Sequence, residues 1–97
     1  MITRVESHRK AAVKYIFDNG NEVSIVFGWG TYSDNHFKDE SACYKSTTAE
    51  IMAFGHDSFV NWFKEKYDGN PGGYIPVSEI PTILQRADGR VTKRGQQ

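Results

Sequence analysis

The sequence has a single cysteine and no long apolar run, and both shortages limit what the protein can be. With Cys43 alone no internal disulfide can form, so we expect a free thiol and a reducing compartment. No stretch approaches the ~20 apolar residues of a membrane-spanning helix. The first residues, Met1 to His8, lack the apolar segment of a secretory signal. These features favour a cytoplasmic protein with no membrane partner.

The chain also lacks an excess of charge of either sign. Its 97 residues include 12 basic and 12 acidic side chains, for a formal net charge of zero. Residues 1–14 hold four basic and one acidic residue, residues 15–70 four and nine, and residues 71–97 four and two. The ends are therefore basic and the middle is acidic. Because a nucleic-acid-binding domain typically has a pI above ~9, this balance argues against a chain-wide nucleic-acid binder.

Residue types that make metal, cofactor or catalytic sites are few and widely spaced. Zinc sites use close ligand pairs, and none exists among His8, His36, His56 and Cys43. The segment 34–40 lacks the Asp-x-Asp-x-Asp-Gly order of a calcium loop, and Gly28-x-Gly30 lacks the third glycine of a dinucleotide-binding turn. We therefore expect no metal, no cofactor and no catalytic residue, as in a protein that is not an enzyme.

The clearest structural signal is a β-hairpin. Two runs of β-branched and aromatic residues, about 11–18 and 21–28, flank Asn19-Gly20. Asn-Gly between such runs predicts a two-residue type I′ turn with both residues at positive φ. This turn would place Ile16 opposite Val23. One face of the hairpin would then carry the apolar residues Ile16, Val23, Ile25 and Phe27, and the other Val13, Tyr15, Phe17 and Val26.

The middle of the chain predicts one more strand and one ambiguous element. Residues 31–46 are polar and without period, which indicates a long loop, and residues 47–54 read as a third strand. Apolar residues at helical spacing follow, and Gly69 would end such a helix. The short aromatic run 59–63 is equally consistent with a strand.

The C-terminal part predicts a helix over about 78–87. Ser78 would cap it, Pro81 would lie in its first turn, and Ile80, Ile83 and Leu84 would form its apolar stripe. The expected fold is therefore α+β: an antiparallel β-sheet of three to four strands with a C-terminal helix packed on one face. We expect one domain over residues 1–89 and a flexible basic tail over residues 90–97.

Four segments in this order resemble a group of small proteins encoded by tailed bacteriophages and prophages. They read YxFDNG at residues 15–20, VSIxFGxGTYxxN at 23–35, TAEI at 48–51 and GYIPxxEIxxIL at 73–84. The resemblance implies a small phage accessory protein in a bacterial cytoplasm. Such proteins often bind and block a host enzyme or a defence system, so it implies a binding protein that inhibits a host protein by occlusion. It assigns no catalytic residue.

We predict that the contact residues lie just after the hairpin. Trp29 and Tyr32 stand among glycines and polar residues, and both types are common in interface hot spots. The acidic residues Asp34, Asp39 and Glu40 would form a polar rim around them. The alternative is an accessory nucleic-acid binder that stacks bases on the aromatic residues Tyr15, Phe17, Trp29 and Tyr32. An enzyme or small-ligand binder is the third hypothesis, and the sequence leaves a homodimer open.

Overall fold

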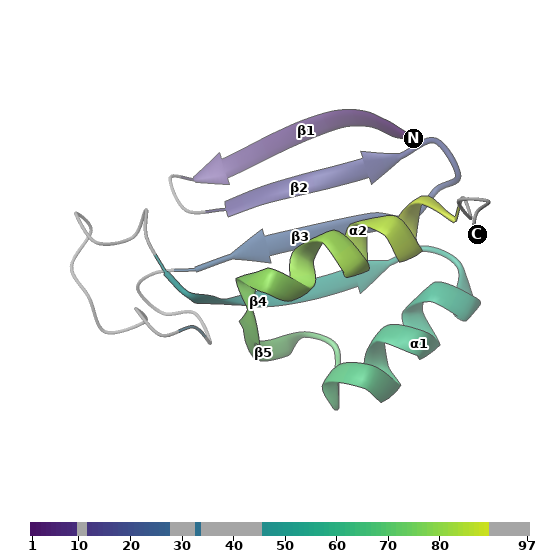
Figure 1. Ribbon diagram of the computed structural model, residues 1–97. Coiled ribbons are helices and arrows are strands. Elements are labelled where there is room, and N and C mark those ends of the chain that lie inside the picture. Colours follow the sequence, from purple (N-terminus) through teal and green to yellow (C-terminus); the bar gives the residue numbers. More distant parts are fainter. Residues whose placement is uncertain (10–11, 28–32, 34–45, 90–97) are drawn as a thin grey trace.

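A computed structural model describes residues 1–9, 12–27, 33 and 46–89. Five antiparallel strands form one sheet in the order β1-β2-β3-β4-β5, and two α-helices pack against it (Figure 1). In chain order the elements are β1 (Ile2–Arg9), β2 (Ala12–Phe17), β3 (Glu22–Val26), β4 (Thr48–Phe54), α1 (Asp57–Tyr67), β5 (Gly72–Pro76), the 3-10 turn η2 (Val77–Glu79) and α2 (Ile80–Asp88). The α+β class and the antiparallel sheet are confirmed. The expected three to four strands were too few, since the sheet has five and residues 2–9 were not expected to form a strand. The predicted tail, residues 90–97, lies outside the described residues.

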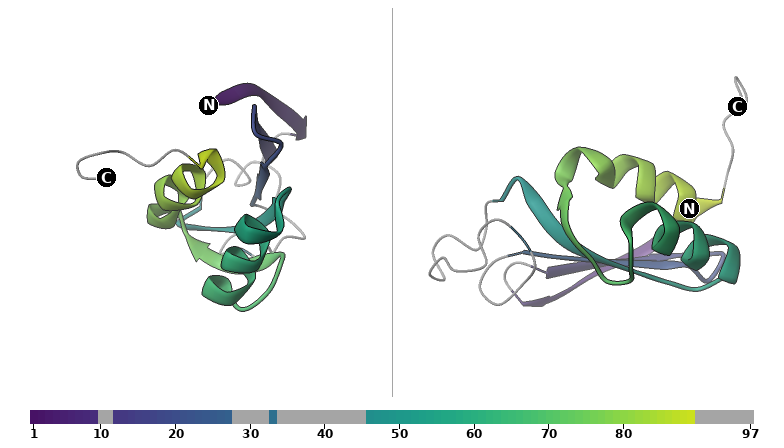
Figure 2. Two further views of the ribbon diagram at one scale, coloured as in Figure 1. Left: turned by 90° about the vertical axis from the view of Figure 1, so that its right-hand side faces the viewer. Right: turned by 90° about the horizontal axis from the view of Figure 1, so that it is seen from below.

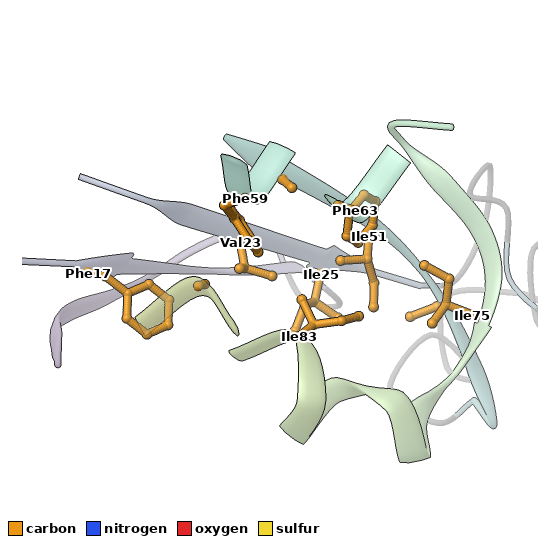
Figure 3. Packing of buried hydrophobic residues seen from close by; sticks show 11 residues of the cluster. Phe17, Val23, Ile25, Ile51, Phe59, Phe63, Ile75 and Ile83 are labelled. Atoms are coloured by element: carbon orange, nitrogen blue, oxygen red, sulfur yellow. The ribbon is translucent and has the colours of Figure 1, made fainter. Parts of the chain in front are cut away.

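Both helices lie on the same side of the sheet (Figure 2). The buried residues of the strands alternate, as in a sheet with one covered face: Val23 and Ile25 in β3, and Ala49, Ile51 and Ala53 in β4. Phe59 and Phe63 from α1 and Ile83 and Ala87 from α2 complete this core. Figure 3 shows the side chains of the sheet and of both helices meeting in one layer.

The two helices resolve what the sequence left open. Residues 57–67 form a helix rather than a strand, with Phe59 and Phe63 facing the core. The C-terminal helix is confirmed, although Ser78 does not cap it: residues 77–79 form η2, and α2 begins at Ile80 with Pro81 in its first turn. In the part of the chain that the structure describes, neither helix is long and apolar enough to cross a membrane.

The hairpin between β2 and β3 is present, but its predicted register was wrong by one residue. Ile16 lies opposite Glu22, not Val23. The connection has three residues, 18–20, and only Gly20 has a positive φ, at +95°. Backbone hydrogen bonds from Phe17 to Asn21 (3.0 Å) and from Gly20 to Phe17 (3.1 Å) close it. Three-residue hairpin loops with glycine in the left-handed position are the next most common class after the two-residue turn.

A shift of one residue exchanges the two faces of a strand. As a result, Val13, Tyr15 and Phe17 face the helices together with Val23 and Ile25. Ile16, which we predicted beside Val23, lies on the opposite side of the sheet. The prediction therefore divided each strand correctly into its two faces, but it placed the wrong face of one strand next to a given face of the other.

Candidate functional site

The five predicted contact residues, Trp29, Tyr32, Asp34, Asp39 and Glu40, lie outside the described residues. So do His36 and Cys43. They belong to the segment that joins β3, the central strand of the sheet, to its neighbour β4. Their role as contact residues stays a prediction.

Two of the four aromatic residues proposed to stack on bases pack in or against the hydrophobic core instead. Phe17 is 4% exposed and belongs to the buried cluster, and Tyr15 packs against that cluster on the helix side. A stacking platform needs aromatic faces that are open to solvent. The hairpin therefore offers no pair of exposed rings at these two positions.

The side of the sheet without helices is the larger candidate surface, and we call it the open face. In an antiparallel sheet, residues directly opposite one another project to the same side. The register across β2, β3 and β4 thus gives three rows of residues on the open face. The first row is Ile16, Glu22 and Phe54, the second is Lys14, Ser24 and Met52, and the third is Ala12, Val26 and Glu50.

Apolar side chains on the open face are partly accessible. Phe54 is 39% exposed, and Ile16, Val26 and Met52 are half-buried. Phenylalanine and methionine are among the residue types enriched at protein interfaces. The helices that the structure describes pack on the other side of the sheet, so contact with these helices does not account for the apolar side chains here.

The charges at the centre of the open face neutralise one another. The Lys14 Nζ atom lies 3.4 Å from the Glu22 Oε1 atom and 5.6 Å from the centre of the Phe54 ring. Lys14 therefore reaches from β2 across β3 to β4 and joins an ion pair to a cation–π contact. The result is a surface with apolar groups around a compensated pair, and not a positive stripe.

Sequence reasoning missed the contribution of β4 to this surface. The alternation of residues 48–54 shows that Glu50, Met52 and Phe54 share one face of this strand, but it does not show which strand lies beside it. Pairing of β3 with β4 brings Phe54 next to Glu22 and Met52 next to Ser24.

His56, the histidine that the structure describes in full, contacts the turn between β2 and β3. Its Nε2 atom lies 2.6 Å from the carbonyl oxygen of Asn19, and its backbone N–H donates to the Asn21 Oδ1 atom at 2.8 Å. Within residues 1–9, 12–27, 33 and 46–89, no group of three or more His, Cys, Asp or Glu residues could hold a metal ion.

Two asparagines of the hairpin join the turn to the end of α2. The Asn19 side-chain amide donates to the carbonyl oxygens of Ala87 (2.8 Å) and Asp88 (3.1 Å). The buried Asn21 side chain donates to Ala87 at 2.9 Å. The last carbonyls of a helix have no partner within the helix, so these amides satisfy them. The hairpin turn is thereby fixed to the end of α2.

Tyr67 links α1 to η2. Its hydroxyl donates to the Glu79 Oε1 atom at 2.9 Å, and its ring contacts Phe63 and Trp62. Burial, the hydrogen bond to Glu79 and the negative charge of Glu79, in that order, raise the pKa of Tyr67 well above its ordinary value.

Tyr67 is therefore expected to make the protein less stable in alkali. Because folding raises the pKa of Tyr67, the stabilisation from its neutral hydroxyl is fully present below the pKa of tyrosine in the unfolded chain, about 10. This stabilisation is lost as the pH rises above that value. We expect the difference in urea midpoint between the wild type and Tyr67→Phe to be largest at neutral pH and to shrink above about pH 10. A difference that stays constant from neutral to alkaline pH would contradict this account of the Tyr67–Glu79 contact.

Comparison with known proteins gives no relative: no protein-family model matches the chain, and neither a curated protein nor a solved structure matches it.

Proposed function

We propose that this chain is a small phage-encoded binding protein that inhibits a protein of its bacterial host by covering part of that protein's surface. The observation that carries the proposal is the open face, where Phe54 is 39% exposed, two residues from Met52 and in the same row as Ile16, while both described helices lie on the other side of the sheet (Figure 2). The resemblance of residues 15–87 to small phage proteins supports the bacterial setting.

The chemistry of the open face favours a protein as the partner. Binding to nucleic acid depends on lysine and arginine residues that neutralise phosphates. On the open face Lys14 is already paired with Glu22 at 3.4 Å. A surface with apolar side chains around a compensated ion pair is instead suited to a protein partner, because protein interfaces combine apolar and polar groups. The predicted contact residues Trp29 and Tyr32 would extend the same interface.

Replacing Phe54 by alanine is expected to weaken binding strongly and to leave the fold intact. Truncating a central aromatic contact typically costs about 2 kcal/mol or more of binding free energy. The measurement is affinity capture from a bacterial lysate by the immobilised wild type, then titration of the captured protein against each variant. Trp29→Ala is expected to act in the same direction, with circular dichroism unchanged.

The matched control is Val77→Ala. Val77 is 42% exposed but lies in η2, away from the open face. It should bind as the wild type does. The proposal fails if the captured protein binds Phe54→Ala and the wild type equally, or if no protein is captured. Capture that nuclease treatment abolishes would favour the nucleic-acid alternative instead.

A further inference from the structure

The Asn19-Gly20 pair in the hairpin turn has the sequence at which asparagine deamidates most readily, and the hydrogen bonds of the fold restrict this reaction. In an Asn-Gly pair, the backbone nitrogen of glycine can attack the side-chain amide carbon of asparagine. A C–N bond forms, ammonia leaves and a five-membered succinimide results. Water then opens this ring to an aspartate or an isoaspartate. Glycine is the most reactive residue at the second position because it has no Cβ to hinder the attack.

Both reacting groups are held in place in the folded protein. The nucleophile, the Gly20 N–H, donates to the Phe17 carbonyl at 3.1 Å. The Asn19 Oδ1 atom accepts from the backbone N–H of Asn21 at 2.9 Å. The leaving group, the Asn19 Nδ2 atom, donates to the Ala87 and Asp88 carbonyls at 2.8 and 3.1 Å. Attack requires the Gly20 nitrogen to lose its proton and to reach the Asn19 Cγ atom, and departure of ammonia requires the Asn19 Nδ2 atom to leave the two carbonyls of α2.

We infer that Asn19 is a deamidation site whose reaction the fold suppresses, so that opening of the contact between the hairpin turn and α2 sets its rate. The inference is independent of any partner. Gly20 is exposed and Asn19 only half-buried, so accessibility to water alone would leave the site reactive. The suppression comes instead from the two carbonyls at the end of α2, which are almost 70 residues away along the chain.

The product would not restore the contact. A carboxylate at position 19 has no N–H to donate to Ala87 and Asp88, and it places a negative charge at the negative end of the α2 dipole. Deamidation in an opened molecule would therefore hinder its return to the original structure. Asn19→Asp imitates the product, and we expect a lower urea midpoint for this variant with the strands retained.

The test compares deamidation of the full chain in mildly alkaline buffer with and without denaturing urea, followed by mass spectrometry of the Asn19 peptide. If the turn is open less than about a tenth of the time, the folded protein should react at least about tenfold more slowly than the unfolded chain. Asn70 gives an internal reference, because the following Pro71 has no N–H and cannot attack by this route.

A second variant tests whether α2 provides the protection. Ile83 belongs to α2 and its side chain is fully buried, and it takes no part in the hydrogen bonds that hold Asn19 and Gly20. Ile83→Ala should speed deamidation of Asn19 in native buffer and leave the rate in urea unchanged; if the variant unfolds, the two rates should become equal. The inference is overturned if the folded and unfolded wild-type chains react at the same rate, or if Ile83→Ala leaves the native rate unchanged.

Discussion

Gly55→Ala is expected to be one of the most destabilising single substitutions in this protein. Gly55 has a φ of +125°, and a Cβ there would lie 2.2 Å from the Asn21 Oδ1 atom and 2.7 Å from the Asn21 Cα atom. The second atom belongs to the backbone, so a change of rotamer cannot relieve the contact. Asn21 would have to move away from both the His56 N–H and the Ala87 carbonyl that it satisfies.

We expect a loss of about 3 kcal/mol or more in the free energy of unfolding, from backbone strain together with buried polar groups left without partners. Urea denaturation gives the measurement, and Gly20→Ala is the matched control. Gly20 also has a positive φ, at +95°, but its nearest neighbour for an added Cβ is the His56 Nε2 atom at 3.8 Å. Gly20→Ala should therefore cost only the backbone strain, about 1–2 kcal/mol. Equal losses in the two variants would show that the contact with Asn21 is unimportant.

Phe63→Ala is the second substitution with a large expected effect. Phe63 is fully buried in α1, and its ring lies 4.8 Å from that of Tyr67. It faces the core cluster with Ile51 and Ile83 (Figure 3). Truncation of a buried phenylalanine leaves a cavity and typically costs 3–5 kcal/mol, so we expect a loss of about that size.

Phe54→Ala removes the same side chain from a position that is 39% exposed on the open face. Less apolar surface is lost from the folded state, and we expect a cost of about 1 kcal/mol or less. Urea denaturation of both variants gives the comparison. Similar losses would mean that Phe54 is part of the core, and its assignment to a binding surface would be wrong.

Local sequence patterns predicted whether most segments form strands or helices. The register of the hairpin and the presence of the edge strand β1 depend on contacts between distant segments, and these patterns did not predict them. Asn19-Gly20 correctly predicted a hairpin, but not its register. The connection has three residues, and the Asn19 side chain within it donates to the end of α2, almost 70 residues away along the chain. The local sequence does not show this contact. The edge strand β1 was missed because residues 2–9 contain only two apolar residues, and an edge strand is held by backbone pairing with one neighbour.

The candidate site was predicted only in part, for a similar reason. The sequence analysis placed Ile16 and Val26 on opposite faces of the hairpin, whereas the observed register places both on the open face. Its most exposed residue, Phe54, comes from β4. No pattern within either segment states that β4 pairs with β3, so the surface could be assembled only from the sheet order.

The most direct test of the open face as the binding surface is site-specific photo-crosslinking. A photoreactive phenylalanine analogue is placed at position 54 in one protein and at position 77 in another, and each is irradiated in a bacterial lysate. We predict that position 54 gives a crosslink to a discrete bacterial protein and that position 77, equally exposed but in η2, gives none. Absence of a crosslink at position 54, or the same product from both positions, would contradict the account.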